Sequence, residues 1–304
     1  MLMSEWVHLG VKLTNGDVKT LSRAISLVEN EKEGYQSFLK QLSLNTQCHI
    51  LGITGPPGAG KSTLTDCLIK HYVNEGKKVG VLCIDPSSPF NYGSILGDRI
   101  RMQGWYNNDQ VFIRSLATRG SLGGLHPKII EITDLIKAAG FDEIIIETVG
   151  VGQSEVEISG VADTTIVVLV PESGDEIQTM KAGLMEIADI FVVNKADRES
   201  ADQFVNNLLL MLAPSFSKKN KISVLKTVAS KAEGINELGA EILRVKMLNH
   251  HSENKLWLLA HKIFLLIQKE KMGNINEEMI RISLKDHVNK PDFNTYLFAE
   301  KYFS

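Results

Sequence analysis

The feature that most constrains this chain is a short loop rich in glycine and proline, GPPGAGKST at residues 55–63. It matches the pattern G-x-x-x-x-G-K-[ST] of a phosphate-binding loop. The apolar run at 49–54 predicts a buried strand before the loop, and Leu64, Leu68 and Tyr72 fall on one face of a helix after it. A strand, a glycine turn and the first turn of a helix form a cradle of backbone N–H groups for an anion. This order of elements favours a nucleotide site over a turn that matches the pattern by chance.

Each position of the loop has an expected part in binding. Lys61 is expected to reach the terminal phosphates and to act in catalysis, and the Ser62 hydroxyl is expected to bind Mg²⁺. The loop residues expected to bind a nucleotide are Gly55, Pro57, Gly58, Ala59, Gly60, Lys61, Ser62 and Thr63.

Composition places the chain among ordinary globular proteins. Of its 304 residues 43% are hydrophobic and 23% charged, and 33 Lys and Arg face 36 Asp and Glu, a net charge of −3. This balance gives no electrostatic argument for nucleic acid. The beginning of the chain has no secretory signal pattern, and no apolar stretch is long enough to cross a bilayer. We therefore expect a cytoplasmic protein without a membrane partner.

From residue 48 onward, predicted strands alternate with predicted helices, which is typical of a parallel sheet covered on both faces. The expected fold is α/β: a three-layer P-loop NTPase with a mostly parallel sheet and helical extensions at both ends. Strands are expected at 48–54, 79–84, 111–115, 143–147, 164–170, 190–194 and 222–228, and helices at 61–75, 125–139, 175–187, 199–212 and 235–248. Residues 17–44 are expected to be helical. The expected domains are an N-terminal helical extension at 1–46, a P-loop domain at 47–249 and a C-terminal helical arm at 250–304, which is expected to serve dimerisation.

Two acidic residues follow the second predicted strand. Asp85 opens DPSSP at 85–89, and Asp98 lies in GSILGDRIRM at 93–102. Carboxylates at the carboxyl end of a parallel strand lie where such sheets bind ligands, so both are candidates to approach Mg²⁺. Solvated carboxylates in an exposed turn explain the same residues equally well.

The predicted strand at 143–147 ends in ETVG at 147–150, which takes the place of the DxxG motif of P-loop GTPases. There the acid holds Mg²⁺ through water, so Glu147 is a candidate for the metal site and for catalysis. Gln153 follows the motif and is a candidate to order the attacking water, although a surface amide fits the sequence as well.

The predicted strand at 190–193 ends in NKAD at 194–197, which resembles the guanine-specificity motif NKxD. An Asp carboxylate accepts two hydrogen bonds from guanine, which adenine cannot offer. We expect Asn194, Lys195 and Asp197 to bind the base, together with three residues after the next strand, Ala229, Ser230 and Lys231. A phosphate loop, an acid and a base motif in this order indicate a GTPase.

These stretches resemble the MeaB/ArgK GTPases, P-loop proteins of the SIMIBI class associated with methylmalonyl-CoA mutase. The most specific matches are GSILGDRIRM and ETVGVGQSEV at 147–156, with further matches at 119–125 and 174–189. The resemblance implies a Mg²⁺-dependent GTPase that binds GTP and GDP, forms a homodimer, and binds a cobalamin-dependent acyl-CoA mutase to gate cofactor loading and protect the enzyme. It implies that Asp85, Asp98 and Glu147 belong to the metal and switch network, and Asp98 is counted with Lys61, Glu147 and Gln153 among the candidate catalytic residues. Gln178 and Lys181 would then lie in a segment that responds to the mutase.

Two other functions remain open from the residues alone. Related GTPases assemble nickel or other metal centres, but such proteins usually carry His-rich tracts or a close cysteine pair, which this sequence lacks. A kinase, as the older ArgK label suggests, would need a site for a phosphate acceptor, and no cluster of residues indicates one.

Overall fold

The structure is a computed structural model, and it describes most of the chain in two compact units, residues 1–251 and 252–304. The described residues are 3–85, 102–117, 125–148, 158–172, 183–212, 222–248 and 253–302, without 274, 276, 286, 289, 291 and 292. Among the described residues, no helix is both long and apolar enough to cross a membrane.

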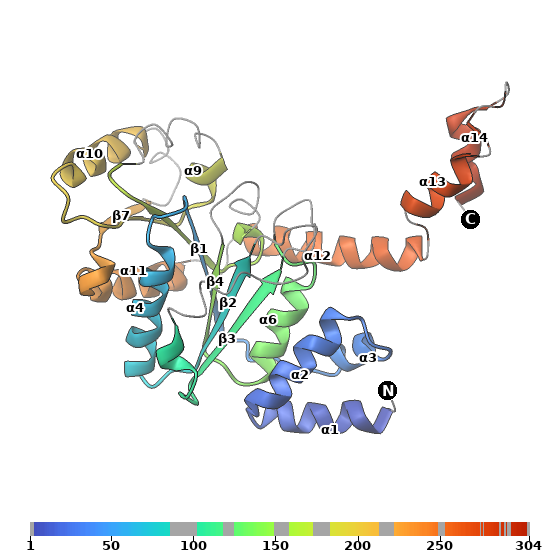
Figure 1. The fold of residues 1–304 in the computed structure, drawn as a ribbon, viewed down its shortest axis with the longest axis horizontal. Coiled ribbons are helices and arrows are strands. Elements are labelled where there is room, and N and C mark those ends of the chain that lie inside the picture. Colours follow the sequence, from blue (N-terminus) through green and yellow to red (C-terminus); the bar gives the residue numbers. More distant parts are fainter. Residues whose placement is uncertain are drawn as a thin grey trace. The chain divides into compact units, whose positions relative to one another are not determined.

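A parallel β-sheet forms the centre of the first unit (Figure 1). Within the described residues it has seven strands in the order β3-β2-β4-β1-β5-β6-β7, and neighbouring strands of the sheet run parallel. The strands are β1 (His49–Thr54), β2 (Val79–Asp85), β3 (Val111–Ala117), β4 (Glu143–Glu147), β5 (Thr164–Leu169), β6 (Ile190–Val193) and β7 (Ser223–Lys226). This sheet confirms the predicted α/β fold and its strands. Runs such as EIIIE in β4 are apolar in the middle and buried on both faces, which is typical of a parallel sheet covered by helices.

Helices cover both faces of the sheet, as Figure 1 shows. On one face α4 (Lys61–Asn74) and α11 (Ile235–Leu248) pack against apolar residues such as Leu51, Ile145 and Val168. On the other face α6 (Ile129–Ala138) and α10 (Ala201–Leu212) pack against different stretches of the same sheet. A short helix, α9 (Gly183–Ile187), ends the segment before β6. The three layers follow from strands that are apolar on both sides.

Helices at the N-terminus extend the core on the α6 face. They are α1 (Met3–Thr14), α2 (Val18–Glu29) and α3 (Tyr35–Leu39). The predicted stripe of Leu21, Ile25 and Val28 is fully buried. The helix α1 lies within the expected helical extension at 1–46 but before the stretch 17–44 that the apolar pattern marks as helical, and its Trp6 and Leu13 are also buried. The Arg114 guanidinium on β3 donates to the Glu29 carboxylate at 2.5 Å and so links α2 to the sheet.

The second unit is helical where it is described. It contains α12 (Glu253–Met272), α13 (Glu277–Lys285) and α14 (Thr295–Ala299). Several apolar side chains of α12 are exposed, among them Leu256, Ile263, Phe264 and Ile267.

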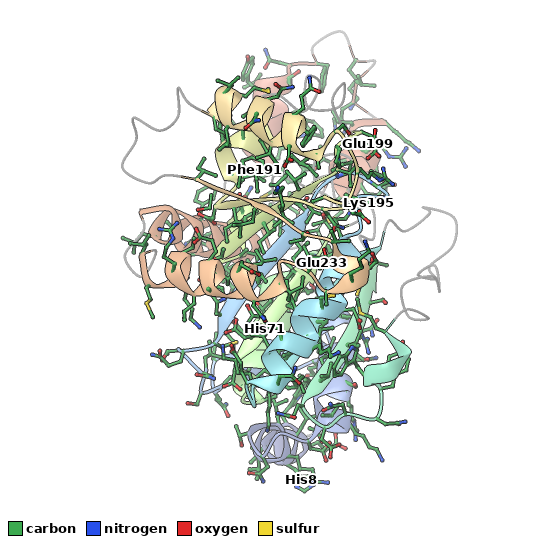
Figure 2. All side chains as sticks on the ribbon, turned by 90° about the vertical axis from the view of Figure 1, so that its left-hand side faces the viewer. His8, His71, Phe191, Lys195, Glu199 and Glu233 are labelled. Carbon is green, nitrogen blue, oxygen red and sulfur yellow. The ribbon has the colours of Figure 1, made fainter. Side chains whose placement is uncertain are left out.

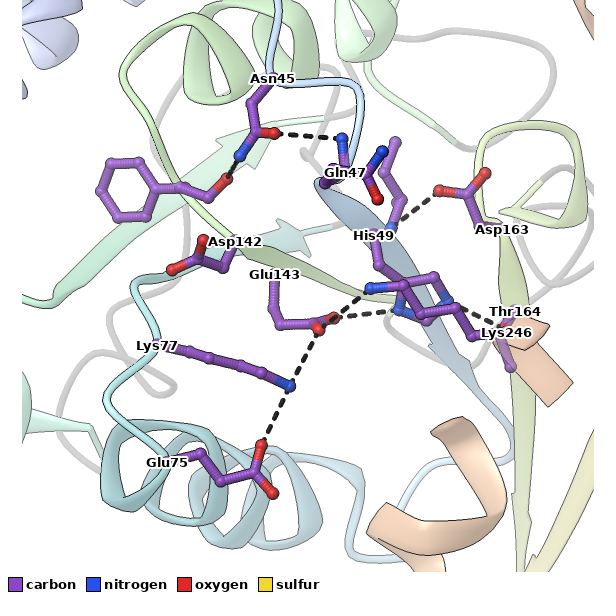
Figure 3. Close-up of polar contacts among 12 residues, drawn as sticks. Asn45, Gln47, His49, Glu75, Lys77, Asp142, Glu143, Asp163, Thr164 and Lys246 are labelled. Carbon is purple, nitrogen blue, oxygen red and sulfur yellow. Dashed lines mark hydrogen bonds and ion pairs between the residues drawn. The ribbon is translucent and has the colours of Figure 1, made fainter. Parts of the chain in front are cut away.

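A buried polar cluster joins the starts of three strands (Figure 3). The His49 ring lies 3.0 Å from the Glu143 carboxylate through Nδ1 and 3.0 Å from the Thr164 hydroxyl through Nε2. Lys77 and Lys246 approach the other carboxylate oxygen of Glu143 at 3.4 and 3.5 Å. Burial raises the pKa of Glu143, but the hydrogen bond and charge of His49 and the charges of both lysines outweigh it, so its pKa is lowered. The cluster therefore fixes the edge of the sheet opposite to the glycine loop.

Candidate functional site

Two adjoining clefts lie at the edge of the sheet where the strands end. One, of 480 Å³, is lined by the glycine loop and by the ends of β2 and β4: Pro57, Gly58, Gly60, Lys61, Ser62, Thr63, Cys83, Ile84, Glu147, Thr148 and Lys195. The other, of 340 Å³, is lined by Gly60, Thr63, Asn194, Lys195, Asp197, Arg198, Val228, Ala229 and Ser230. Because Gly60, Thr63 and Lys195 line both clefts, one elongated ligand can occupy both.

The glycine loop has the backbone conformation that its glycines predict. Gly55 has φ 134°, and a Cβ there would run into the backbone carbonyl of Val168. Gly60 has φ 88° and caps the N-terminus of α4, and a Cβ there would meet the Asn194 amide. Any other residue at either position would be strained and would also clash. The N-terminus of α4 therefore opens directly onto the first cleft, where its dipole favours an anion.

Lys61 begins α4 and is buried. Its ammonium group donates to the carbonyl oxygens of Gly55 at 2.8 Å and Pro56 at 2.9 Å. The lysine thus folds back over the loop that it follows, at the floor of the first cleft. Phosphate oxygens would be stronger acceptors for this charge than backbone carbonyls.

Glu147 ends β4 and meets the first turns of α4. Its carboxylate is buried and accepts hydrogen bonds from the Ser62 hydroxyl at 2.6 Å and the Thr65 hydroxyl at 2.8 Å. The predicted pair of Ser62 and Glu147 is therefore brought together, although 85 positions separate them. Thr65 was not singled out from the sequence, because helical spacing alone marks it as a core position.

The donor set at this point suits a hard cation. Mg²⁺ prefers oxygen ligands and usually takes one or two from the protein, with the remainder from phosphates and water. A hydroxyl and a carboxylate beside a phosphate cradle fit that preference. The register pairs Cys83 with Glu147, so Asp85 lies two residues further along the neighbouring strand at the same edge. Among the described residues, no three His, Cys, Asp or Glu side chains gather to hold a metal ion by themselves.

Asn194 joins the two clefts from within. Its amide nitrogen donates to the Ala59 carbonyl at 2.9 Å, and its oxygen accepts from the Thr227 hydroxyl and the Ala229 N–H, both at 3.1 Å. The side chain is buried. One amide thereby connects the glycine loop, the end of β6 and the turn after β7.

The charged residues of the second cleft lie nearer to solvent. The Lys195 ammonium crosses to the Gly58 carbonyl at 2.8 Å, so its aliphatic stem runs along both clefts. Figure 2 shows Lys195 beyond the loop end of α4, with His71 nearer the other end of that helix. The Asp197 carboxylate lies 3.2 Å from the Lys231 ammonium, and both side chains are about half exposed. Ala229, Ser230 and Lys231 form a short 3-10 turn beside them.

Several predicted site residues lie outside the described residues. They are Asp98, Gln153, Gln178 and Lys181; the backbone of Asp85 is described but its side chain is not. One contact that the sequence did not predict involves Trp105, which follows the second predicted strand and residues 86–101 in the sequence. Its indole N–H donates to the Asp66 carboxylate on α4 at 2.7 Å.

Comparison with known proteins gives a consistent result. A family model described as methylmalonyl Co-A mutase-associated GTPase MeaB matches residues 21–257. A protein of Pyrococcus horikoshii named as a GTPase is 50% identical over 236 residues, which cover 76% of this chain and 74% of that protein. The crystal structure of an LAO/AO transport system kinase has a TM-score of 0.69 and 25% identity, and the match covers 100% of this chain and 99% of that one.

A second relative is much longer than this chain. The fused isobutyryl-CoA mutase of Geobacillus kaustophilus is 34% identical over 280 residues, which cover 88% of this chain and 26% of that protein. A stretch similar to most of this chain is therefore one part of a larger polypeptide named as a mutase.

Proposed function

The chain belongs to the MeaB family of mutase-associated GTPases, and from that premise we propose that it is a GTP-hydrolysing chaperone for a cobalamin-dependent acyl-CoA mutase. It would bind the mutase, gate the loading of its cofactor and protect the enzyme. The observation that carries this proposal is the fused isobutyryl-CoA mutase, where a stretch similar to this chain shares one polypeptide with a mutase. Parts that work together are often joined in this way.

In this proposal the first cleft binds the phosphates of GTP or GDP. The backbone N–H groups of the glycine loop and the dipole of α4 attract the phosphates. Lys61 exchanges its two loop carbonyls for phosphate oxygens and there stabilises the charge that develops during hydrolysis. Its burial strengthens this interaction, because little water competes for the ammonium group.

Ser62 and Glu147 are the residues that would hold Mg²⁺, Ser62 through its hydroxyl and Glu147 directly or through water. When bound, the cation supplies positive charge beside the phosphate oxygens. Asp85 and Asp98 stay candidates for the same site, and Gln153 stays a candidate to orient the attacking water.

The second cleft would bind guanine. Asp197 accepts from the base N1–H and N2–H₂, and for this the carboxylate must exchange its partner Lys231. The Lys195 stem packs on the base plane. The N–H groups of Ala229 and Lys231 already donate to Asn194 and Val228, so the Ser230 N–H is the donor of this turn that would bind the base carbonyl. Asn194 holds the turn and the glycine loop in register.

The second unit would serve homodimer formation. The exposed apolar side chains of α12 support this, because a helix with such a face usually buries it against a partner. Gln178 and Lys181 are proposed to respond to the mutase, on the strength of family resemblance alone.

A steady-state GTPase assay, titrated with the mutase encoded by the same organism, tests the partner. We expect a slow basal rate that rises to a plateau as the mutase saturates, because a partner can complete or order the site. Lys61→Ala is the matched control: it should bind the mutase without a stimulated rate. If the rate stays flat, and the mutase binds the GDP and GTP-analogue forms equally, the chaperone role is wrong and only a GTPase remains.

A further inference from the structure

The Glu147 carboxylate is held from one helix by two hydroxyl groups, one for each of its oxygens. Ser62 donates to Oε1 at 2.6 Å, and Thr65 donates to Oε2 at 2.8 Å. Residues three apart lie on the same side of a helix, so the two hydroxyls point to the same strand end. The Thr65 side chain is fully buried, and Glu147 is 5% exposed. Little water reaches this carboxylate to replace either partner.

The two hydroxyl groups differ in their position relative to the first cleft. Ser62 lines the first cleft, whereas Thr65 does not. A threonine inside a helix usually donates to the backbone carbonyl one turn back. The Thr65 hydroxyl donates to a side chain on the neighbouring strand instead, 82 positions away. Thr65 therefore holds the Glu147 carboxylate from a position outside the lining of the first cleft.

The proposed binding of Mg²⁺ would give Ser62 two tasks. A hydroxyl group that coordinates a cation uses one lone pair and keeps its hydrogen to donate, so Ser62 would serve the cation and Oε1 at once. Thr65 has no such second task. The hydrogen bond from Thr65 to Oε2 therefore orients the carboxylate so that Oε1 lies beside Ser62 at the cleft.

We infer that Thr65 is a positioning residue of the proposed nucleotide–metal site, acting through Glu147 and touching neither nucleotide nor cation. This inference rests on the proposed function. Partners that orient a metal-binding carboxylate typically change metal affinity by about 10–100-fold when they are removed. The effect should therefore appear in the contribution of Mg²⁺ to nucleotide binding, and not in nucleotide binding without the metal.

The experiment separates the hydroxyl of Thr65 from its methyl group. GDP affinity is measured for the full chain with Mg²⁺ and with EDTA, and the ratio of the two is the magnesium effect. Thr65→Val keeps the shape and removes the hydroxyl, Thr65→Ser keeps the hydroxyl and removes the methyl, and Thr65→Ala removes both. We expect Thr65→Val and Thr65→Ala to reduce the magnesium effect by about tenfold or more, and Thr65→Ser to retain it. The EDTA affinities should stay close to the parent value.

A matched control is Thr133→Val on α6. Thr133 is also buried in a helix, but its hydroxyl donates to the Ile130 carbonyl, and neither residue lines either cleft. It should leave the magnesium effect unchanged. If Thr65→Ser and Thr65→Ala lose the magnesium effect together while Thr65→Val retains it, packing of the methyl group is responsible and the inference is overturned. A magnesium effect in Thr65→Val equal to that of the parent overturns it as well.

The failure of the proposed site looks different. If the parent protein shows no magnesium effect on GDP affinity at all, then Ser62 and Glu147 do not hold the cation, and both proposals are overturned together. If the parent shows a clear magnesium effect and Thr65→Val keeps it, only the role of Thr65 is overturned.

Discussion

The backbone N–H of Ala229 donates to the side-chain oxygen of Asn194 at 3.1 Å, across 35 positions of the chain. The other end of the same amide donates to the Ala59 carbonyl in the glycine loop, across 135 positions. One buried side chain therefore connects the first cleft, proposed to bind the phosphates, with the second cleft, proposed to bind the base. For a nucleotide that occupies both clefts, Asn194 already holds the glycine loop and the turn after β7 in place.

Asn194→Ala is expected to weaken the fold and the site together. The change leaves the Ala59 carbonyl, the Ala229 N–H and the Thr227 hydroxyl without this partner, and a buried group left unsatisfied costs about 1–3 kcal/mol. Urea unfolding without nucleotide measures the loss of stability, and calorimetry with GDP measures the loss of affinity. An unchanged GDP affinity would show that these hydrogen bonds are not needed for binding.

Lys61→Ala is expected to abolish most hydrolysis while the fold survives. Hydrogen bonds to charged groups are worth about 1.5–3 kcal/mol, which corresponds to roughly 10–100-fold in rate or affinity. A GTPase assay measures the effect. Lys70→Ala, at an exposed position of the same helix, is the control for loss of a positive charge. A Lys61 variant that hydrolyses GTP at the parental rate would refute the loop assignment.

Asp197→Asn is expected to change the base preference of the site from guanine to xanthine. The amide offers one acceptor and one donor, so guanine should bind weakly and xanthine, with a carbonyl at C2, should bind better. Stability should hardly change, because the pair with Lys231 is half exposed. The control is Asp202→Asn, which removes another exposed pair, with Lys226 at 2.7 Å. Calorimetry with both nucleotides decides; equal affinity for GTP in parent and variant removes the guanine assignment.

Glu143→Gln is expected to destabilise the protein in a manner that depends on pH. Burial opposes the charge of Glu143, but His49, Lys246 and Lys77 hold its pKa below the ordinary value of 4.5. A carboxyl with a lowered pKa contributes stability above its unfolded pKa and loses it as pH falls through the folded pKa. The difference between parent and variant should therefore be largest near neutral pH and shrink below about pH 4.5.

Thermal or urea unfolding at several pH values measures this difference. Glu237→Gln, at an exposed position of α11, is the control for the change of charge. A stability difference that is constant from pH 7 to well below the ordinary carboxyl range would mean that packing, and not the charge of Glu143, holds the cluster.

The local sequence determined the strands, most of the helices and the kind of ligand. A strand that is apolar on both sides, such as IFVV in β6, leaves no alternative to a sheet covered on both faces. Gly60 permits a positive φ that other residues rarely adopt, so the loop conformation was already contained in its motif. The bounds of α1 were not predicted within the expected helical extension, because Trp6 packs on Phe38 of α3, a contact that no local pattern reveals.

Tertiary structure alone decided which side chains meet. Nothing near Thr65 in the sequence indicates a partner on β4, and nothing near Asn194 indicates that it would bind both the glycine loop and the turn after β7. Periodicity reports which face of an element is buried, but not which residue of another element lies opposite. That depends on strand order and register, which pair Cys83 with Glu147 and bring the ends of β4 and β6 to the same edge of the sheet. Sequence order carries the local preferences of the chain, whereas the meeting of distant polar groups follows from how whole elements pack.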